Sequence, residues 1–182
     1  MKTSKKAFLL VAMLMLCTMA TNARDNIIVE GSFAKLQTVN KFNIDIDWSN
    51  IHVNGLNLSE WIRFRNNEQP SYDAEDEYQH ELKPTWVKMV DSANDKLNSK
   101  QIFLLHNSPE QDYTIIVSPH QIDRKGNLEA FCSIINRNDE VLVKFVLTGK
   151  GGIFGTMSNL WGDGFKSAGK NLAKILQKYL HK

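Results

Sequence analysis

The chain has 182 residues, of which 42% are hydrophobic and 23% are charged, and its formal net charge at pH 7 is +2. This length is sufficient for one domain with its own hydrophobic core. Three of the 22 Lys and Arg residues lie among the first 23 residues, which contain no acid, so 19 basic and 20 acidic side chains remain. That balance lacks the basic excess of a nucleic-acid-binding domain, and we expect no nucleic-acid partner.

The N-terminus has the pattern of an export signal. Lys2, Lys5 and Lys6 precede the apolar run AFLLVAMLMLCTMA, and Ala23 offers a small residue for cleavage. The run is short for a membrane span. We therefore predict a signal peptide over residues 1–23, cleaved near Ala23, a domain over 24–182, and a periplasmic or secreted location. The alternatives are an uncleaved anchor and lipid attachment at Cys17, which the bulky residues before that cysteine disfavour.

Cys132 is the only cysteine of the predicted mature domain, which therefore has no internal disulfide. It lies in the apolar run AFCSII, which favours a buried small hydrophobic residue. The alternative is a Cys132 nucleophile that the fold pairs with His106 or His120. The sequence has no zinc-binding histidine motif and no serine-nucleophile motif. We therefore expect no catalytic residues, no metal and no cofactor.

The first half of the predicted domain contains one clear strand and one short helix. Residues 41–48 alternate with a period of two, which predicts a strand. Four apolar side chains would share one of its faces: Phe42, Ile44, Ile46 and Trp48. A helix is predicted near 59–65, with Ser59 as its N-cap. Residues 66–81 are polar and acidic, so we predict a solvated connector, with an acidic binding loop as the alternative.

The second half begins with a helix over residues 84–98, opened by Pro84, which is favoured in the first turn. Its apolar stripe recurs at helical spacing: Trp86, Met89, Val90, Ala93 and Leu97. From residue 101 the period is two again. Turn residues separate four predicted strands, at 101–106, 112–119, 128–136 and 140–149, of which the last two are expected to form a hairpin.

A long amphipathic helix, predicted near 157–180, ends the chain. Its apolar positions follow helical spacing, and lysines recur every fourth residue on the other side. The helix would either dock its apolar face on the sheet or lie on an anionic membrane surface. The candidate contacts with a membrane or a partner are Trp161, Phe165, Lys166, Lys170, Lys174 and Lys178.

Within this helix, GFKSAGKN (164–171) matches the phosphate-binding pattern G-x-x-x-x-G-K but has Asn171 where Ser or Thr should follow. Such a loop lies directly between a strand and a helix, early in a parallel sheet. This stretch lies well past the last predicted strand, so we predict no nucleotide binding. Glycine costs about 1 kcal/mol relative to alanine inside a helix. We therefore interpret Gly162, Gly164 and Gly169 as points where the helix backbone packs closely against a neighbour.

Three stretches of the chain resemble a group of small exported proteins from Bacteroidetes bacteria that share a glycine-rich C-terminal helix motif. They are FNIDIDWSNIHVNGLNLSEW, DYTIIVSPHQID and GKGGIFGTMSNLWGDGFKSAGKNLAKIL. Members of this group often have glycine where Ala173 stands here. The chain is more distantly similar to the small α/β domains of curli-secretion and Tol-system accessory proteins. The resemblance implies an α+β domain of the cell envelope and brings no catalytic residues.

These patterns together predict one α+β domain. It should contain a single mixed or antiparallel sheet of about five strands, with two or three helices packed mainly on one face. The expected function is that of an exported, non-catalytic protein that binds a partner protein or another component of the cell envelope. The alternatives are a membrane-surface protein acting through its cationic C-terminal helix, and a Cys132-dependent enzyme.

Overall fold

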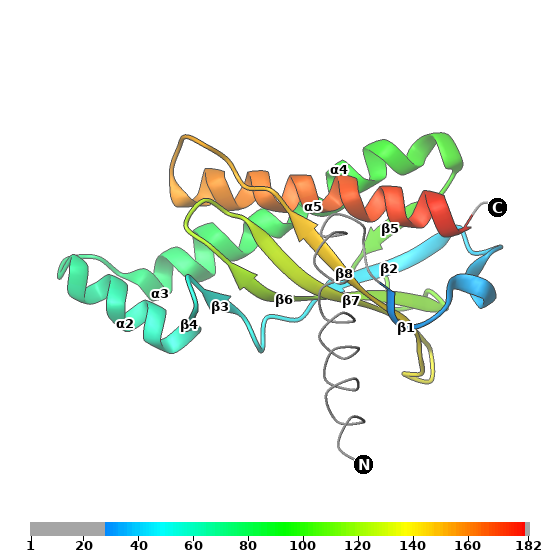
Figure 1. Cartoon of the computed structure of the whole chain (residues 1–182), viewed down its shortest axis with the longest axis horizontal. Coiled ribbons are helices and arrows are strands. Elements are labelled where there is room, and N and C mark those ends of the chain that lie inside the picture. The colour runs from blue at the N-terminus through cyan, green and yellow to red at the C-terminus, as the bar shows by residue number, and fades with distance from the viewer. Residues whose placement is uncertain (1–27, 181–182) are drawn as a thin grey trace, which may run out of the picture.

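The computed structural model describes residues 28–180. Figure 1 shows one twisted sheet, with the helices of residues 87–97 and 157–180 on the same side of it. The predicted signal peptide, its cleavage site near Ala23 and Cys17 lie outside the described residues. Between residues 28 and 180, none of the helices combines the length and the apolar character that crossing a bilayer requires.

Eight strands form the sheet, and its order is β1-β8-β7-β6-β2-β5, with β3 beside β6 and β4 beside β3. The strands are β1 (Ile28–Gly31), β2 (Lys41–Ile46), β3 (His52–Val53), β4 (Leu56–Asn57), β5 (Phe103–His106), β6 (Tyr113–Ile122), β7 (Leu128–Asn136) and β8 (Val141–Gly149). The neighbours β1 and β8, β8 and β7, and β7 and β6 are antiparallel. In contrast, β2 runs parallel to both β6 and β5. The predicted α+β class is confirmed, and of the two predicted sheet types, mixed or antiparallel, the mixed one is present, but the expected number of strands is too low. Three strands were missed: β3 and β4 have two residues each, too short to show a period, and β1 has four.

The longest strand, β6, organises the sheet because it pairs along one edge with two short strands in turn. Asn43 to Ile46 of β2 align with its first half, and His52 and Val53 of β3 align with its last residues. The prediction ended this strand at Pro119. A register shift between Pro119 and Gln121 lets the strand continue to Ile122, since a bulge tolerates a residue without an N–H donor.

The helices are α2 (Leu58–Glu68), α3 (Ala74–Asp76), α4 (Val87–Leu97) and α5 (Met157–Leu180), and shorter 3-10 turns lie at Phe33–Leu36, Lys83–Trp86 and Asn98–Lys100. A π-helical turn spans Glu77–Leu82. α4 and α5 pack against each other and cover one face of the sheet, while α2 and α3 lie beyond its end near β3 and β4 (Figure 1).

The N-cap of α2 differs from the prediction. Asn57, not Ser59, occupies the cap: its Oδ1 accepts a hydrogen bond from the Glu60 amide at 3.0 Å, and Glu60 Oε2 accepts one from the Asn57 amide at 3.3 Å. This reciprocal pair is a capping box. Ser59 lies in the first turn, where its hydroxyl donates to Asn57 Oδ1 at 2.8 Å.

Residues 66–81 are mostly exposed to solvent, as their composition predicted, but they are largely helical and are more than a connector. They contain the end of α2, then α3 and most of the π-helical turn. Ala74, Tyr78 and Leu82 are buried, and their spacing of four residues places all three on one side of the helical segment. Two buried residues of this acidic stretch, Ala74 and Tyr78, and Leu82 directly after it therefore anchor the helical segment, and the average composition of residues 66–81 conceals the first two.

α5 has the predicted bounds, and two of its glycines allow backbone contact with neighbouring elements. A Cβ atom added to Gly164 would overlap the carbonyl oxygen of Gly126, in the β6–β7 turn, and one added to Gly169 would overlap that of Met89 in α4. The close packing proposed for these two glycines is confirmed. At Gly162, by contrast, an added Cβ would meet only the side chain of Lys88.

Candidate functional site

The sheet has two unlike faces. Toward α4 and α5, residues such as Val117, Cys132 and Phe145 are fully buried. No helix between residues 28 and 180 covers the other face, which we call the open face. The residues that define it are Asn43, Asp45, Asp47, Thr114, Ile116, Ser118, His120, Glu129, Phe131, Ser133, Ile135, Lys144, Val146 and Thr148.

The open face is more apolar than the solvated face of a sheet usually is. A sheet with one solvated face normally alternates apolar residues toward the core with polar residues toward water. Here Ile116, Phe131, Ile135 and Val146 face outward and are only half-buried. They lie beside polar cross-strand partners: Ile116 is opposite Ser133, and Ser118 is opposite Phe131. The result is an apolar strip bordered by hydroxyl and charged groups.

A central hollow of about 280 Å³ lies on this face. Its lining residues are Asp47, Asn50, Ser118, Pro119, His120, Phe131, Ser133 and Lys144. The Phe131 ring and Pro119 are the apolar parts of the wall. Lys144 Nζ lies 5.1 Å from its centroid, and the His120 ring centroid lies 5.8 Å from it. Lysine over an aromatic face is a favourable cation–π arrangement, which holds the ammonium group at the edge of the hollow.

Asp47 supplies a fixed negative charge to the same hollow. Its Oδ1 accepts a hydrogen bond from the Ser49 amide at 3.0 Å, and Ser118 Oγ donates to its Oδ2 at 3.4 Å. The bonds from Ser49, chiefly the backbone one, lower the pKa of Asp47 below its ordinary value, because they stabilise the ionised form. At neutral pH the hollow thus presents a carboxylate acceptor and an ammonium donor around an aromatic ring.

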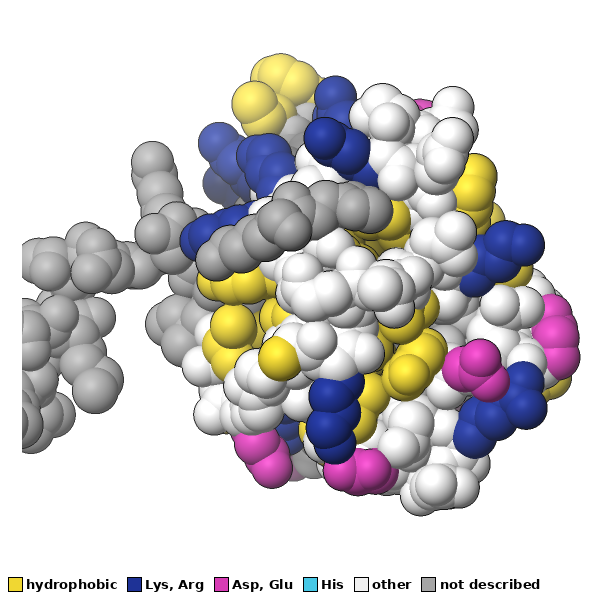
Figure 2. All heavy atoms as spheres, turned by 90° about the vertical axis from the view of Figure 1, so that its right-hand side faces the viewer, with side chains coloured by type: hydrophobic (Ala, Val, Ile, Leu, Met, Phe, Trp, Pro, Cys, Tyr) yellow, Lys and Arg dark blue, Asp and Glu magenta, His cyan; other side chains and the backbone are white. Residues whose placement is uncertain are grey.

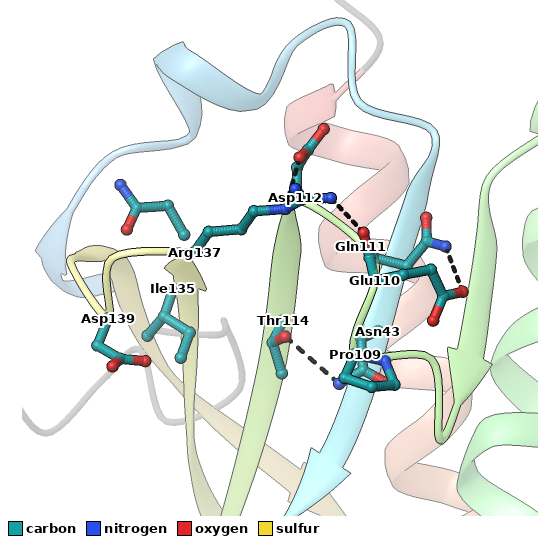
Figure 3. A pocket seen from close by; sticks show the side chains of 10 residues that line it. Asn43, Pro109, Glu110, Gln111, Asp112, Thr114, Ile135, Arg137 and Asp139 are labelled. Atoms are coloured by element: carbon teal, nitrogen blue, oxygen red, sulfur yellow. Dashed lines mark hydrogen bonds and ion pairs between the residues drawn. The ribbon is translucent and has the colours of Figure 1, made fainter.

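A second, terminal hollow of about 490 Å³ lies at one end of the open face. Figure 3 shows Thr114 and Ile135 on neighbouring strands below two turns that form its walls. Arg137 extends from one turn to the other, where Nε lies 2.9 Å from Asp112 Oδ1 and the guanidinium donates to the carbonyl oxygen of Glu110. Asn43 ties the floor together through bonds to Thr114 Oγ1 and the Ser108 amide.

The chemistry of both hollows suits binding. Each combines at least one apolar side chain, Phe131 or Ile135, with several hydrogen-bond donors and acceptors that could orient a bound group. Among residues 28–180, no hydrogen bond joins a histidine ring nitrogen to a hydroxyl or thiol group, the contact that activates a nucleophile. The same residues contain no group of three His, Cys, Asp or Glu side chains placed to hold a metal ion.

The structure separates the candidate contact residues of α5 into two sets. Trp161 and Phe165 are fully buried between helix and sheet, so contact through them would require α5 to leave the sheet. The lysines at 166, 170, 174 and 178 are exposed. Figure 2, which faces the end of the molecule near the C-terminus of α5, shows several Lys and Arg side chains near its upper edge, on the side of α4 and α5.

Cys132 lies in the core and faces the helices. Burial raises the pKa of its thiol far above the ordinary value. His120 is on the opposite face, beside Phe131, and the His106 ring packs against Trp86 with a centroid distance of 4.7 Å. The fold brings neither histidine into hydrogen-bonding contact with the thiol. These positions do not support the hypothesis of a Cys132 nucleophile.

The sequence patterns did not lead us to predict the open face, although the sequence contains a signal for it. A strand with one solvated face shows single apolar residues, whereas a strand with two apolar faces shows adjacent pairs. Such pairs occur at Ile115–Ile116, Ile134–Ile135 and Val146–Leu147. They indicate that both faces of the central strands are apolar in part.

Comparison with known proteins gives a distant structural likeness. No family model matches the sequence, and no curated protein matches it. Among solved structures, the chain is similar to the PelC dodecamer from Paraburkholderia phytofirmans, with a TM-score of 0.39, 11% identity, and coverage of 81% of this chain and 97% of that chain. A variant of the same dodecamer gives a TM-score of 0.40 and 10% identity, covering 81% and 95%. Likeness at this level does not identify a function.

Proposed function

We propose that the chain is an exported, non-catalytic binding protein of the cell envelope and that it binds its partner on the open face. The observation that carries this proposal is the half-buried apolar strip formed by Ile116, Phe131, Ile135 and Val146, with a hollow beside each end of it. An exposed apolar patch rimmed by polar groups marks an interaction site. Export is supported by the leader pattern of residues 1–23 and by the resemblance to exported Bacteroidetes proteins.

The partner should present an apolar group to Phe131 and complementary polar groups to its two charged neighbours. Asp47 accepts hydrogen bonds and Lys144 donates them, and they lie in the same hollow. A cation or amide on the partner would meet the first, and a carboxylate or carbonyl would meet the second. Aromatic anchors that become desolvated on binding often supply most of the binding energy, and Phe131 is the aromatic candidate for this role in the hollow.

Photo-crosslinking in cells tests this proposal. A photoreactive phenylalanine at position 131 should give a discrete crosslinked species, because this ring lies in the centre of the open face. The same group at Lys174, exposed on α5, is the matched control and should not give that species. Once the partner is identified, Phe131→Ala should weaken its binding by about thirtyfold, the effect of removing a hot-spot side chain.

A second substitution separates specific binding from random proximity. Ser133→Arg places a long charged side chain in the central hollow and should abolish the crosslink from position 131 while leaving thermal unfolding nearly unchanged. Crosslinks that persist in this variant, or that appear equally from position 174, would contradict the open face as the binding site. A metal-dependent or hydrolytic activity of the purified protein would contradict the non-catalytic role.

A further inference from the structure

The loop between β8 and α5 exposes two large apolar side chains. Ile153 is 80% exposed and Phe154 is 89% exposed, whereas the next most exposed large hydrophobic residue of the described chain, Val29, is 54% exposed. Neither side chain belongs to the core. The fold therefore does not account for an isoleucine and a phenylalanine at the tip of this loop, and large exposed apolar groups indicate an interaction.

The loop lies against the outward side of α5. A Cβ atom added to Gly152 would meet the carboxylate of Asp163, and one added to Gly155 would meet Asn159. Asn159 and Asp163 are both exposed residues of α5. Because Ile153 and Phe154 lie between these two glycines, the apolar tip stands at the N-terminal end of the outward side of the helix. Figure 1 shows the loop rising above this end of α5.

The rest of that outward side is cationic. Lys166, Lys170 and Lys174 follow the acidic Asp163 along the exposed side of α5, and Lys178 continues the row. The ion pairs found among residues 28–180 include none of these four lysines. The adjacent exposed side of α4 is balanced in charge and carries Lys88, Asp91, Asp95 and Lys96. The positive charge is thus concentrated on α5.

We propose that Ile153, Phe154 and the four lysines of α5 form one docking surface for an anionic lipid bilayer. The two apolar side chains would enter the interface between headgroups and acyl chains, as the apolar residues of peripheral proteins do. The lysines would lie at the level of the anionic headgroups, each adding to the attraction. Trp161 and Phe165 take no part, because they stay buried under the helix.

A lipid surface fits these residues better than a protein surface does. A stable protein interface buries about 800 Å² on each partner around an apolar centre. Here the apolar part is a convex tip of two side chains, and the remainder is a row of lysines, which are depleted at the centres of protein interfaces. The inference is independent of the proposed function, since α5 and the open face are on opposite sides of the sheet.

Vesicle flotation tests the proposal on the protein as its host exports it. The protein should float with vesicles that contain about one third phosphatidylglycerol and not with pure phosphatidylcholine, and added salt should weaken binding because it screens surface charge. The double substitution Ile153→Ser with Phe154→Ser should reduce binding to the anionic vesicles at least about tenfold. Replacing Lys166, Lys170 and Lys174 by glutamine should reduce it about a hundredfold. Phe64→Ser with Val87→Ser removes apolar side chains exposed elsewhere and should leave binding unchanged.

An environment-sensitive fluorophore gives a second readout at the tip. Attached to Phe154→Cys, it should shift its emission to the blue with anionic vesicles and not with neutral ones; Cys132 does not compete for label because it is buried. Failure of the unmodified protein to float, or full binding by the Ile153/Phe154 variant with its unfolding unchanged, would overturn the proposal. So would self-association that depends on the tip without vesicle binding, because it would make the tip a protein contact.

Discussion

Burial determines the chemistry of Cys132. The thiolate is the reactive form of cysteine, and an apolar environment disfavours that charge, so burial raises the pKa of this thiol. Ser133, the next residue, points to the opposite face of the same strand and is half-exposed. Two adjacent positions of β7 therefore differ in their access to solvent: a side chain at 132 is inaccessible, and one at 133 can be reached by a reagent.

Thiol-labelling kinetics test this difference. In the folded protein, Cys132 should react with a soluble disulfide reagent at least about a thousandfold more slowly than in denaturant, because reaction requires unfolding. A cysteine introduced by Ser133→Cys is the control and should react promptly in the folded state. Because the pKa of Cys132 is raised in the folded state, its contribution to the free energy of unfolding should be fully present below about pH 8.5. It should decline above that pH, as the thiol ionises in the unfolded state. Rapid labelling of native Cys132 would contradict this account.

At the level of elements, α5 depends on two neighbours that approach its backbone. Gly164 lies against the carbonyl oxygen of Gly126, and Gly169 lies against that of Met89. Backbone atoms cannot move aside as a side chain can. These contacts join the C-terminal helix to the β6–β7 turn and to α4, which explains glycines that would otherwise weaken the helix.

Two alanine substitutions in α5 should therefore have opposite effects. Gly164→Ala should lower the free energy of unfolding by about 2 kcal/mol, because the cost of overpacking exceeds the gain in helix propensity. Gly162→Ala should raise it by about 0.5 kcal/mol, since only the flexible Lys88 side chain must move. Urea denaturation of both variants measures the difference. Equal effects would show that propensity alone, and not close packing, governs the helix.

Long periodic elements can be predicted well from the sequence, whereas short elements that depend on distant partners cannot. The bounds of α5 and the hairpin of β7 and β8 follow from local periodicity. The strands β3 and β4 have two residues each. β3 exists because β6, a partner far away in sequence, offers a free edge, and β4 in turn pairs with β3. The open face was missed for a related reason. The adjacent apolar pairs indicate two partly apolar faces, but whether Ile116 or Phe131 meets water depends on where the helices lie, which no local pattern contains.

At the scale of the whole molecule, the two proposed binding surfaces lie on opposite sides. α4 and α5 form one layer, whose outward surface carries the lysines and the apolar tip. The sheet forms the other layer, with the open face and its two hollows turned away from the helices. If α5 docks on a bilayer, the open face points away from the lipid and remains accessible to a partner.

Collisional quenching tests this orientation directly. A fluorophore at Phe154→Cys should lose its accessibility to aqueous iodide when anionic vesicles are added, because the tip enters the interface. A fluorophore at Ser133→Cys should remain accessible, because a full helix layer separates the open face from the lipid. The two variants share label and vesicles and differ only in the side of the molecule. Protection at position 133 with continued quenching at 154 would reverse the orientation, since the open face itself would then meet the membrane through Phe131 and Ile135.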